Sequence, residues 1–174
     1  VTNVVMRVDG FAMMPNFTFG TAMTTFTGQN IGAGKIDRIE EGTKKGLKLG
    51  LIVSAVLVAI LLLFGEFLIA RFTNTEEIIE MGGKMLRILA FGYLMFAVTQ
   101  ILSGVMRGAG RTVMPMIISI IATIIVRVPI AYIVEYFTRT DKAVLGSGSY
   151  YSIYISLLAS WTVGGVLTLL YYIK

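Results

Sequence analysis

The sequence FTGQNIGAGKIDR, residues 26–38, joins an apolar, threonine-rich segment to a glycine-rich turn and then to a basic segment. A second glycine-rich turn, MRGAGRTVMP at residues 106–115, closes a later pair of apolar segments. Long apolar runs dominate the rest of the chain: 56% of the residues are hydrophobic, only 14% are charged, and the mean hydropathy is +0.80. This composition lies outside the range of soluble domains and predicts a membrane protein.

Five apolar segments reach or approach the length of a membrane span, which is about 20 residues for roughly 30 Å of hydrocarbon. The sequence therefore predicts an all-α polytopic membrane protein, a single transmembrane domain over residues 1–174, with helices near residues 4–30, 47–72, 84–106, 113–137 and 150–173. Val1 is not a natural start residue and no signal peptide opens the chain, so we expect a fragment of a longer protein.

Several classes of function are excluded by composition and spacing. The sequence has no cysteine and no histidine, which removes disulfides, thiolate chemistry and histidine-based catalysis or metal binding. The glycine-rich turn lacks the spacing of a Walker loop and of a dinucleotide-binding loop. The net charge of +5 comes from bases between apolar segments, so membrane topology explains it better than nucleic acid does. We expect neither an enzyme nor a cofactor.

The first predicted helix, residues 4–30, is polar for a membrane span, because it carries Pro15, Asn16 and five threonines between residues 18 and 27. At 100° per residue, Asn16 and Thr27 share one face. We expect this helix to be enclosed by other helices or to face a water-filled cavity, which makes Asn16 and Thr27 candidate substrate-binding residues. Alternatively, the threonine hydroxyls bond to their own helix and only assist packing.

One narrow face of the predicted helix 84–106 carries Tyr93, Phe96, Gln100 and Ser103 at helical spacing. Aromatic faces with a few hydrogen-bonding groups suit a large organic ligand, so these four residues are candidate substrate-binding residues as well. Alternatively, Gln100 and Ser103 hydrogen-bond to neighbouring helices and only hold them together. The sequence does not separate the two interpretations.

Arg127 lies well inside the apolar run 113–137, where a central charge costs about 3 kcal/mol and needs a partner or a path to water. Asp9, near the start of the first helix, is the expected partner, and an extended side chain that reaches the interface is the alternative. Glu135 and Arg139 are expected to form a surface pair at i, i+4.

Small residues recur every four positions at the start of the second predicted helix and indicate close approach of another backbone: Gly42, Gly46, Gly50 and Ser54. The distribution of bases predicts the orientation, with eight lysines and arginines on the side of the two glycine-rich turns and the C-terminus and six on the other side. We expect both turns and the C-terminus in the cytoplasm of a prokaryote, with the chain a multi-pass protein of the inner (plasma) membrane.

A series of short motifs resembles the multidrug and toxic compound extrusion (MATE) family in order and spacing. These motifs are Arg7 with FAMMP at 11–15, GQNIGAG at 28–34, Phe72-Thr73 before an acidic turn, LRI at 86–88, MRGAGRT at 106–112 with Pro115, and RVPIAY at 127–132. The resemblance covers nearly the whole chain. It implies a fold of twelve helices in two six-helix lobes, of which this chain would be the eighth to twelfth helices, in the C-terminal lobe.

The resemblance also implies a secondary active transporter. Such a protein exports drugs or toxic organic compounds, expected to be cationic, by alternating access coupled to Na⁺ or H⁺. The missing N-terminal lobe and the lipid bilayer would be its partners. In several members of the family the coupling carboxylates lie in the N-terminal lobe or in the seventh and tenth helices, and residues 84–106, which would be the tenth, contain no acid. The coupling ion is therefore expected to bind outside this fragment.

Eight residues are expected to have structural or gating roles in this family context: Gly28, Gln29, Gly32, Gly34, Gly108, Gly110, Arg127 and Asp9. Three other functions remain open. A flippase for lipid-linked oligosaccharide or peptidoglycan precursors shares the architecture and is expected to carry more cavity bases than Arg127 alone. A membrane-embedded enzyme needs a reactive set that the sequence does not show, and a structural subunit would use its polar stripes only for packing.

Overall fold

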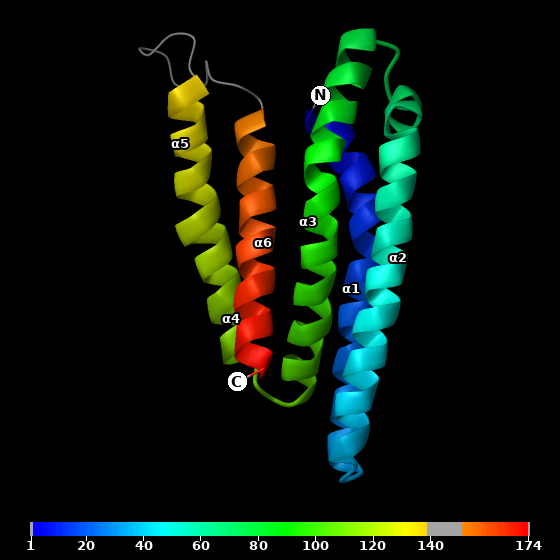
Figure 1. Cartoon of the computed structure of the whole chain (residues 1–174), viewed down its shortest axis with the longest axis vertical. Coiled ribbons are helices and arrows are strands. Elements are labelled where there is room, and N and C mark those ends of the chain that lie inside the picture. Colours follow the sequence, from blue (N-terminus) through cyan, green and yellow to red (C-terminus); the bar gives the residue numbers. More distant parts are fainter. Residues whose placement is uncertain (1, 139–150, 174) are drawn as a thin grey trace.

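The computed structural model describes residues 2–138 and 151–173. These residues form α1 (Thr2–Gly32), α2 (Ile36–Ala70), α3 (Glu76–Gly108), α4 (Val113–Ile120), the π-helix η1 (Ile121–Arg127), α5 (Val128–Thr138) and α6 (Tyr151–Ile173). Because α4, η1 and α5 continue into one another, the described chain contains five long helices, which run up and down in sequence order (Figure 1). The predicted all-α fold is confirmed. Arg139, of the expected Glu135–Arg139 pair, lies outside the described residues.

Four helices in the described part of the chain are long and apolar enough to cross a membrane: Ile36–Ala70, Glu76–Gly108, Val113–Thr138 and Ser152–Ile173. The polar α1, with 31 residues, is not among them. Three of its exposed threonines donate hydrogen bonds to the carbonyl four residues earlier, at 3.0 Å for Thr18, 3.1 Å for Thr21 and 3.3 Å for Thr25. These bonds satisfy the hydroxyls within the helix and reduce the cost of exposing them to lipid.

Two helices begin earlier than the hydropathy pattern predicts, since α2 starts at Ile36 and α3 at Glu76. Ion pairs at i, i+4 extend both helices beyond the apolar run, and each has an N–O distance of 2.6 Å: Glu40–Lys44, Glu41–Lys45 and Glu80–Lys84. Such pairs stabilise exposed helix turns. Hydropathy detects only the part of a helix that lies in the membrane, so it misses these charged extensions.

The two glycine-rich turns end their helices in the same way. In the first, Gly34 has φ of +69°, the N–H of Lys35 bonds to the Asn30 carbonyl at 2.9 Å, and the Gly34 N–H bonds to the Ile31 carbonyl. The second repeats this pattern with Gly110 at φ of +78°. These are Schellman caps, which require the left-handed conformation that glycine adopts without strain. Both turns lie at the same end of the bundle as the C-terminus (Figure 1).

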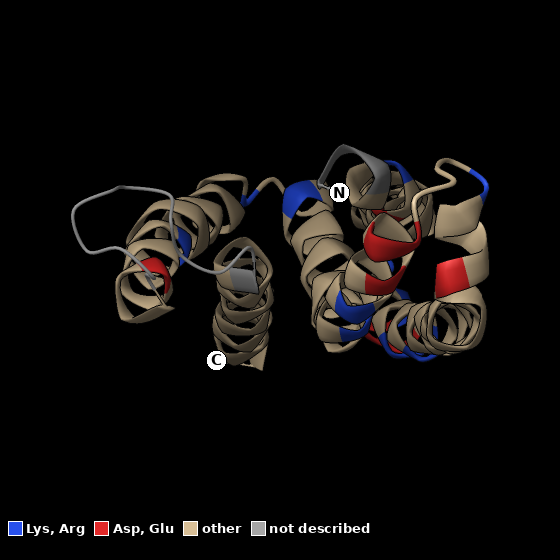
Figure 2. Ribbon diagram, turned by 90° about the horizontal axis from the view of Figure 1, so that it is seen from above, with Lys and Arg blue, Asp and Glu red and all other residues tan. Residues whose placement is uncertain are grey.

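The central helix is α3, which packs against α1, α2 and α6. In α3, 56% of the apolar span is buried, compared with 11% in the helix Val113–Thr138. Figure 2 shows α6 between the α1–α3 group and the helix formed by α4, η1 and α5. The main core joins four helices through buried side chains: Val5, Val8, Ala12, Leu61, Ile69, Met85, Leu86, Leu89, Tyr93, Tyr154 and Trp161.

Close approach of two backbones occurs between α1 and α3, at two pairs of glycines. A Cβ on Gly104 would lie 3.2 Å from the Gly20 Cα, and a Cβ on Gly108 would lie 3.2 Å from the Gly28 nitrogen. Larger side chains at these positions would push the helices apart. Gly28 and Gly108, which the sequence singled out in the two turns, therefore contact each other.

The small residues of α2 make a different contact from the one expected. A Cβ on Gly46 would lie 2.8 Å from the Met23 sulfur, and Gly42 faces the Phe26 ring. These glycines make room for large side chains of α1. The predicted helix packing of this face is confirmed, but at Gly42 and Gly46 the partner is a side chain rather than a closely approaching backbone. The spacing of small residues identifies a contact face, but it does not reveal whether the partner helix presents glycines or bulky groups.

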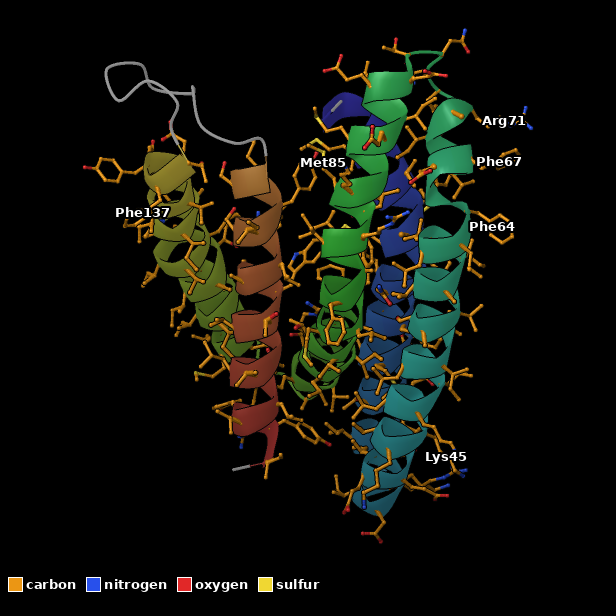
Figure 3. The ribbon with its side chains drawn as sticks, turned by 45° about the horizontal axis from the view of Figure 1, so that its top comes forward. Lys45, Phe64, Phe67, Arg71, Met85 and Phe137 are labelled. Carbon is orange, nitrogen blue, oxygen red and sulfur yellow. The ribbon has the colours of Figure 1, made fainter. Side chains whose placement is uncertain are left out.

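The outer surface of the bundle is apolar. Phe64 and Phe67 on α2 and Phe137 on α5 point away from the other helices (Figure 3), and 81% of Phe137 is exposed. Exposed apolar surface of this extent marks contact with a membrane or another protein. The Arg71 guanidinium lies 4.6 Å from the centre of the Phe67 ring, an arrangement that keeps an aromatic ring and a charge together at the end of α2.

Candidate functional site

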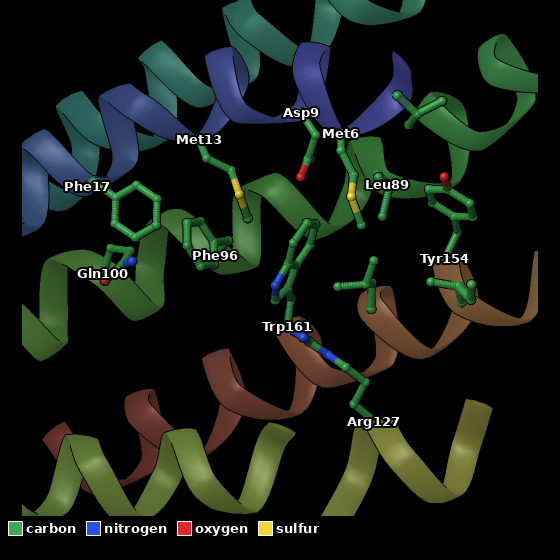
Figure 4. A pocket seen from close by; sticks show the side chains of 13 residues that line it. Met6, Asp9, Met13, Phe17, Leu89, Phe96, Gln100, Arg127, Tyr154 and Trp161 are labelled. Carbon is green, nitrogen blue, oxygen red and sulfur yellow. The ribbon is translucent and has the colours of Figure 1, made fainter. Parts of the chain in front are cut away.

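A cavity of about 300 Å³ lies between α1, α3, η1 and α6. Its polar wall consists of Asp9, Gln100 and Arg127, and Phe17, Phe96, Tyr154 and Trp161 are the aromatic residues that line it. Aliphatic and methionine side chains complete the lining: Val5, Met6, Met13, Leu89, Ile153 and Leu157. Figure 4 shows these side chains converging from α1, α3 and α6, with Arg127 reaching in from the helix beyond α6. A mostly apolar cavity with a few polar groups is typical of small-molecule sites.

The carboxylate of Asp9 is held by a tyrosine on the neighbouring helix. The phenol of Tyr93 donates a hydrogen bond to Asp9 Oδ1 at 2.5 Å, Asp9 is half-buried and Tyr93 is 2% exposed. A hydrogen bond to a charged acceptor is shorter and stronger than a neutral one. The bond links α1 to α3 and orients the carboxylate at the cavity wall (Figure 4).

Aromatic rings form a continuous series along one side of the cavity. Phe17 meets Phe96 edge to face with ring centres 5.4 Å apart, Phe96 and Trp161 are 5.5 Å apart, and Tyr93 and Trp161 are 5.6 Å apart. Such separations are favourable for aromatic pairs and contribute about 1 kcal/mol each beyond buried area. The series joins α1, α3 and α6, so it also sets the distance between the helices that surround the cavity.

Arg127 lies at the end of η1 and lines two cavities. Pro129 has no N–H to donate to the carbonyl of Ile125, which accounts for a local departure from α-helical bonding in this region. The expected ion pair with Asp9 is not formed, because Asp9 accepts its bond from Tyr93 and the Arg127 Nε is buried without a hydrogen-bond partner in the described part of the chain. The two charges share a cavity without neutralising each other.

The residues predicted to bind substrate do not form one surface. Phe96 and Gln100 line the cavity. Tyr93 does not line it, but its phenol donates a hydrogen bond to Asp9, which does. Ser103 is buried in α3. Asn16 and Thr27, on α1, are also buried and outside the cavity wall, and Thr27 instead lines a separate pocket near the C-terminal end of α6.

Asn16 makes a polar contact inside the bundle. The Ser54 hydroxyl donates a hydrogen bond to Asn16 Oδ1 at 2.8 Å, and both residues are 1% exposed. This bond joins α1 to α2 and accounts for the amide oxygen of Asn16, whereas Asn16 Nδ2 is buried without a hydrogen-bond partner in the described part of the chain. The bond also gives the fourth member of the small-residue series a function as a hydrogen-bond donor.

We expect the Asn16–Ser54 bond to contribute little stability, because transmembrane hydrogen bonds average about 0.6 kcal/mol in coupling free energy. A double-mutant cycle of Ser54→Ala and Asn16→Ala, followed by unfolding in mixed micelles, measures the coupling. A coupling energy above about 2 kcal/mol would show that the pair belongs to a larger polar network and would contradict the simple packing role.

Sequence reasoning missed Trp161, which lines the cavity and whose ring contacts Phe96 and Tyr93. It is the single tryptophan of the chain and lies in the middle of an apolar helix, away from the interfacial zone where tryptophan is common in membrane proteins. A tryptophan in that position could have been identified from the sequence as a candidate for an internal site. Phe17, Met6 and Leu89 had no such signal, since an apolar residue in a membrane helix can equally face lipid.

The described residues form a bundle with four helices long and apolar enough to cross a membrane, around a cavity that Asp9 and Arg127 line without pairing. This arrangement belongs to the class of polytopic membrane proteins. The chain is a member of one family within that class, because the MatE family model matches residues 1–133. It is thus a multi-pass membrane protein of a transporter family.

Sequence similarity to individual proteins supports this membership. The chain is 31% identical over 138 residues to the probable multidrug resistance protein YoeA of Bacillus subtilis, and 32% identical over 133 residues to the probable multidrug resistance protein NorM of Thermotoga maritima. These alignments include 79% and 76% of this chain but only 30% and 29% of the relatives. The chain therefore spans about 30% of the length of the curated relatives that it matches.

A solved structure gives the same fold. The inward-facing conformation of a multidrug resistance MATE family transporter of the MOP superfamily superimposes with a TM-score of 0.81 and 21% sequence identity, over 97% of this chain and 37% of that chain. The helices described above therefore have the arrangement of part of a MATE transporter.

Proposed function

We propose that the complete protein exports small organic compounds across the membrane and that this chain supplies one wall of the substrate path. The observation that carries this proposal is the cavity in which Asp9, Phe96 and Trp161 place a carboxylate next to aromatic faces. Organic cations are attracted to both groups, and a largely apolar wall accepts compounds of varied shape. The names of the relatives, which refer to multidrug resistance, support export as the direction of transport.

In this proposal residues 1–174 form one transmembrane domain, the eighth to twelfth helices of a twelve-helix protein. Substrate moves by alternating access as this lobe rocks against the N-terminal lobe. The glycine contacts between α1 and α3 keep the moving lobe rigid. The capped turns at Gly34 and Gly110 end α1 and α3 at one end of this lobe. Gln29 and Gly32, which are exposed at the end of α1, are available to contact the other lobe.

The proposal also includes orientation and coupling. Basic residues near the glycine-rich turns favour a cytoplasmic location for that end of the bundle and for the C-terminus, in the inner membrane of a prokaryote. Transport is coupled to Na⁺ or H⁺. The coupling ion binds in the rest of the protein, since residues 84–106 lack the acid that the family carries in its tenth helix.

Asp9→Asn in the complete protein is expected to lower export of a cationic dye about tenfold, because an amide keeps the shape of the side chain but loses the charge-assisted interactions. Efflux of the dye from proteoliposomes under an imposed Na⁺ or H⁺ gradient measures this effect. The response to the ion gradient is expected to remain in the variant.

Asp37→Asn is the matched control, since Asp37 is exposed in the first turn of α2 and lies outside this cavity. It is expected to leave export unchanged. If Asp9→Asn binds the dye normally and loses only the response to the gradient, the coupling ion binds in this chain. The proposal that it binds in the rest of the protein is then wrong. If deletion of the gene impairs surface glycans and leaves dye export intact, the flippase function replaces the proposed one.

A further inference from the structure

We infer that an anionic phospholipid binds in a second hollow of this bundle, with its phosphate group at Arg111 and an acyl chain along apolar side chains of α2 and α3. This hollow, which we call the interfacial groove, lies where α1, α3 and α6 end and α2 begins, at the end of the bundle with both glycine-rich turns (Figure 1). None of the described residues that line the groove also lines the cavity with Asp9. The inference therefore concerns a lipid site and is independent of the transported substrate.

The interfacial groove has two adjoining parts, of about 330 Å³ and about 540 Å³, which share Ile36, Ile39 and Tyr172. Both volumes lie in the range of ligand sites in proteins, about 300 to 1,000 Å³. Ile36 and Ile173 are 60% and 73% exposed, so the apolar lining continues to the outer surface of the bundle, where an acyl chain extends from the groove into the membrane. Further apolar side chains come from α1, α2 and α3: Ile31, Leu47, Val105 and Met106.

The phosphate is assigned to Arg111, in the turn between α3 and α4. Among the described residues that line the smaller part of the groove, Arg111 is the only charged one. Its side chain is exposed and makes no ion pair or hydrogen bond with residues 2–138 and 151–173. A guanidinium binds a phosphate through two parallel N–H···O bonds, and basic pockets between membrane helices bind anionic headgroups.

A buried hydroxyl without a partner lies in the same part of the groove. Thr27 lines it and is 0% exposed, and its Oγ1 has no hydrogen-bond partner in the described part of the chain. Thr43 and Thr168, which are also buried, donate to the carbonyl four residues earlier at 2.7 Å. A buried hydroxyl left unsatisfied is costly, and a lipid oxygen would satisfy it. Tyr171 and Tyr172 supply further hydroxyls, as tyrosines commonly do at a membrane interface.

The charges at this end of the bundle favour an anionic lipid over a zwitterionic one. In the larger part of the groove Glu40 and Lys44 pair with each other at 2.6 Å, which leaves Asp37 as the acid without an ion pair among its described residues. A surplus of positive charge attracts anionic headgroups. Five bases at this end form no ion pair within residues 2–138 and 151–173: Lys35, Arg38, Lys48, Arg107 and Arg111.

The experiment compares lipids that share their acyl chains and differ in headgroup charge. The complete protein is purified in detergent, stripped of lipid and titrated with phosphatidylglycerol or phosphatidylethanolamine, and native mass spectrometry measures the lipid-bound fraction. We expect the unmodified protein to bind phosphatidylglycerol about fivefold more tightly, as one additional favourable charge contact predicts. Glycerol 3-phosphate, a soluble headgroup without acyl chains, is expected not to compete.

Arg111→Gln is expected to weaken the binding of phosphatidylglycerol about tenfold, through the loss of one charge-assisted interaction. Thr27→Val keeps the shape of the side chain and removes the hydroxyl, and it is expected to weaken binding about threefold. The matched control is Arg71→Gln, because Arg71 is exposed at the other end of α2 and outside the groove. It is expected to leave lipid binding unchanged.

An equal loss in Arg111→Gln and Arg71→Gln would overturn the inference, since general surface charge would then attract the lipid. Unchanged binding in both Arg111→Gln and Thr27→Val would overturn it as well, because the groove would be covered by another part of the complete protein. Equal affinity for the two lipids would show that headgroup charge is not recognised, and competition by glycerol 3-phosphate would assign the site to a soluble phosphate compound. Both of these results contradict an anionic lipid site, and all four leave the proposed export function to its own test.

Discussion

Gly104→Ala is expected to destabilise the protein by about 2 kcal/mol, within the range for overpacking a tight contact. The added Cβ would collide with the Gly20 carbonyl and lie 3.2 Å from the Gly20 Cα. Because the obstacle is backbone rather than the flexible end of a side chain, α1 and α3 must move apart to admit the methyl group. Thermal unfolding of the complete protein in detergent, followed by size-exclusion chromatography of the heated sample, measures the loss.

Gly10→Ala is the matched control for this variant. Gly10 lies in the exposed part of α1, and a Cβ at this position would meet nothing within 4 Å. Alanine there is expected to stabilise the protein by about 0.5 to 1 kcal/mol through helix propensity. The two substitutions therefore have opposite signs although their chemistry is the same. Equal effects would show that α1 and α3 are not in backbone contact at Gly104.

Trp161→Ala is expected to cost about 3 to 5 kcal/mol, the range for truncating a large buried aromatic side chain. Trp161 is 7% exposed, and its ring contacts Tyr93 and Phe96 of α3. The ring also fills the space next to Gly92, where a Cβ would lie 2.5 Å from a ring carbon. Loss of the indole leaves a void between α3 and α6 and widens the cavity, so dye binding is expected to weaken along with stability.

Phe91→Ala provides the comparison, because Phe91 lies on the same helix as Tyr93 and is 74% exposed. Removal of an exposed apolar side chain is expected to change the free energy of unfolding by less than about 0.5 kcal/mol. The same heated-sample measurement and the same dye titration apply to both variants. If Trp161→Ala is as stable as Phe91→Ala, α6 is not held to α3 through this ring.

Much of the fold could be predicted from local signals. The apolar runs located the membrane helices because burial in lipid requires about 20 apolar residues in a row. The paired glycines of the two turns predicted chain reversals, and both turns adopt the positive φ that only glycine accepts easily. The charged extensions of α2 and α3 were missed because they lie outside the apolar runs, although their i, i+4 pairs are visible in the sequence.

The candidate site was predictable only in part. Two residues of the predicted stripe on α3, Phe96 and Gln100, line the cavity, since helical spacing identifies residues that share one face. Their role in substrate binding stays a prediction. The expected pairing of Asp9 with Arg127 was wrong. Sequence patterns rank partners by charge alone, whereas the hydrogen bond of Asp9 to Tyr93 depends on the position of α3 between α1 and α6.

The sequence by itself determined that the chain is a bundle of membrane helices, where those helices reverse, and which family it belongs to. These properties depend on composition, periodicity and short motifs that are contained within single segments. Only the tertiary structure decided that Asp9 and Arg127 face one cavity unpaired, that Gly104 meets Gly20, and that Gly46 receives a side chain. Such contacts depend on the rotation and lateral placement of each helix, which packing of the whole bundle sets and no single segment encodes.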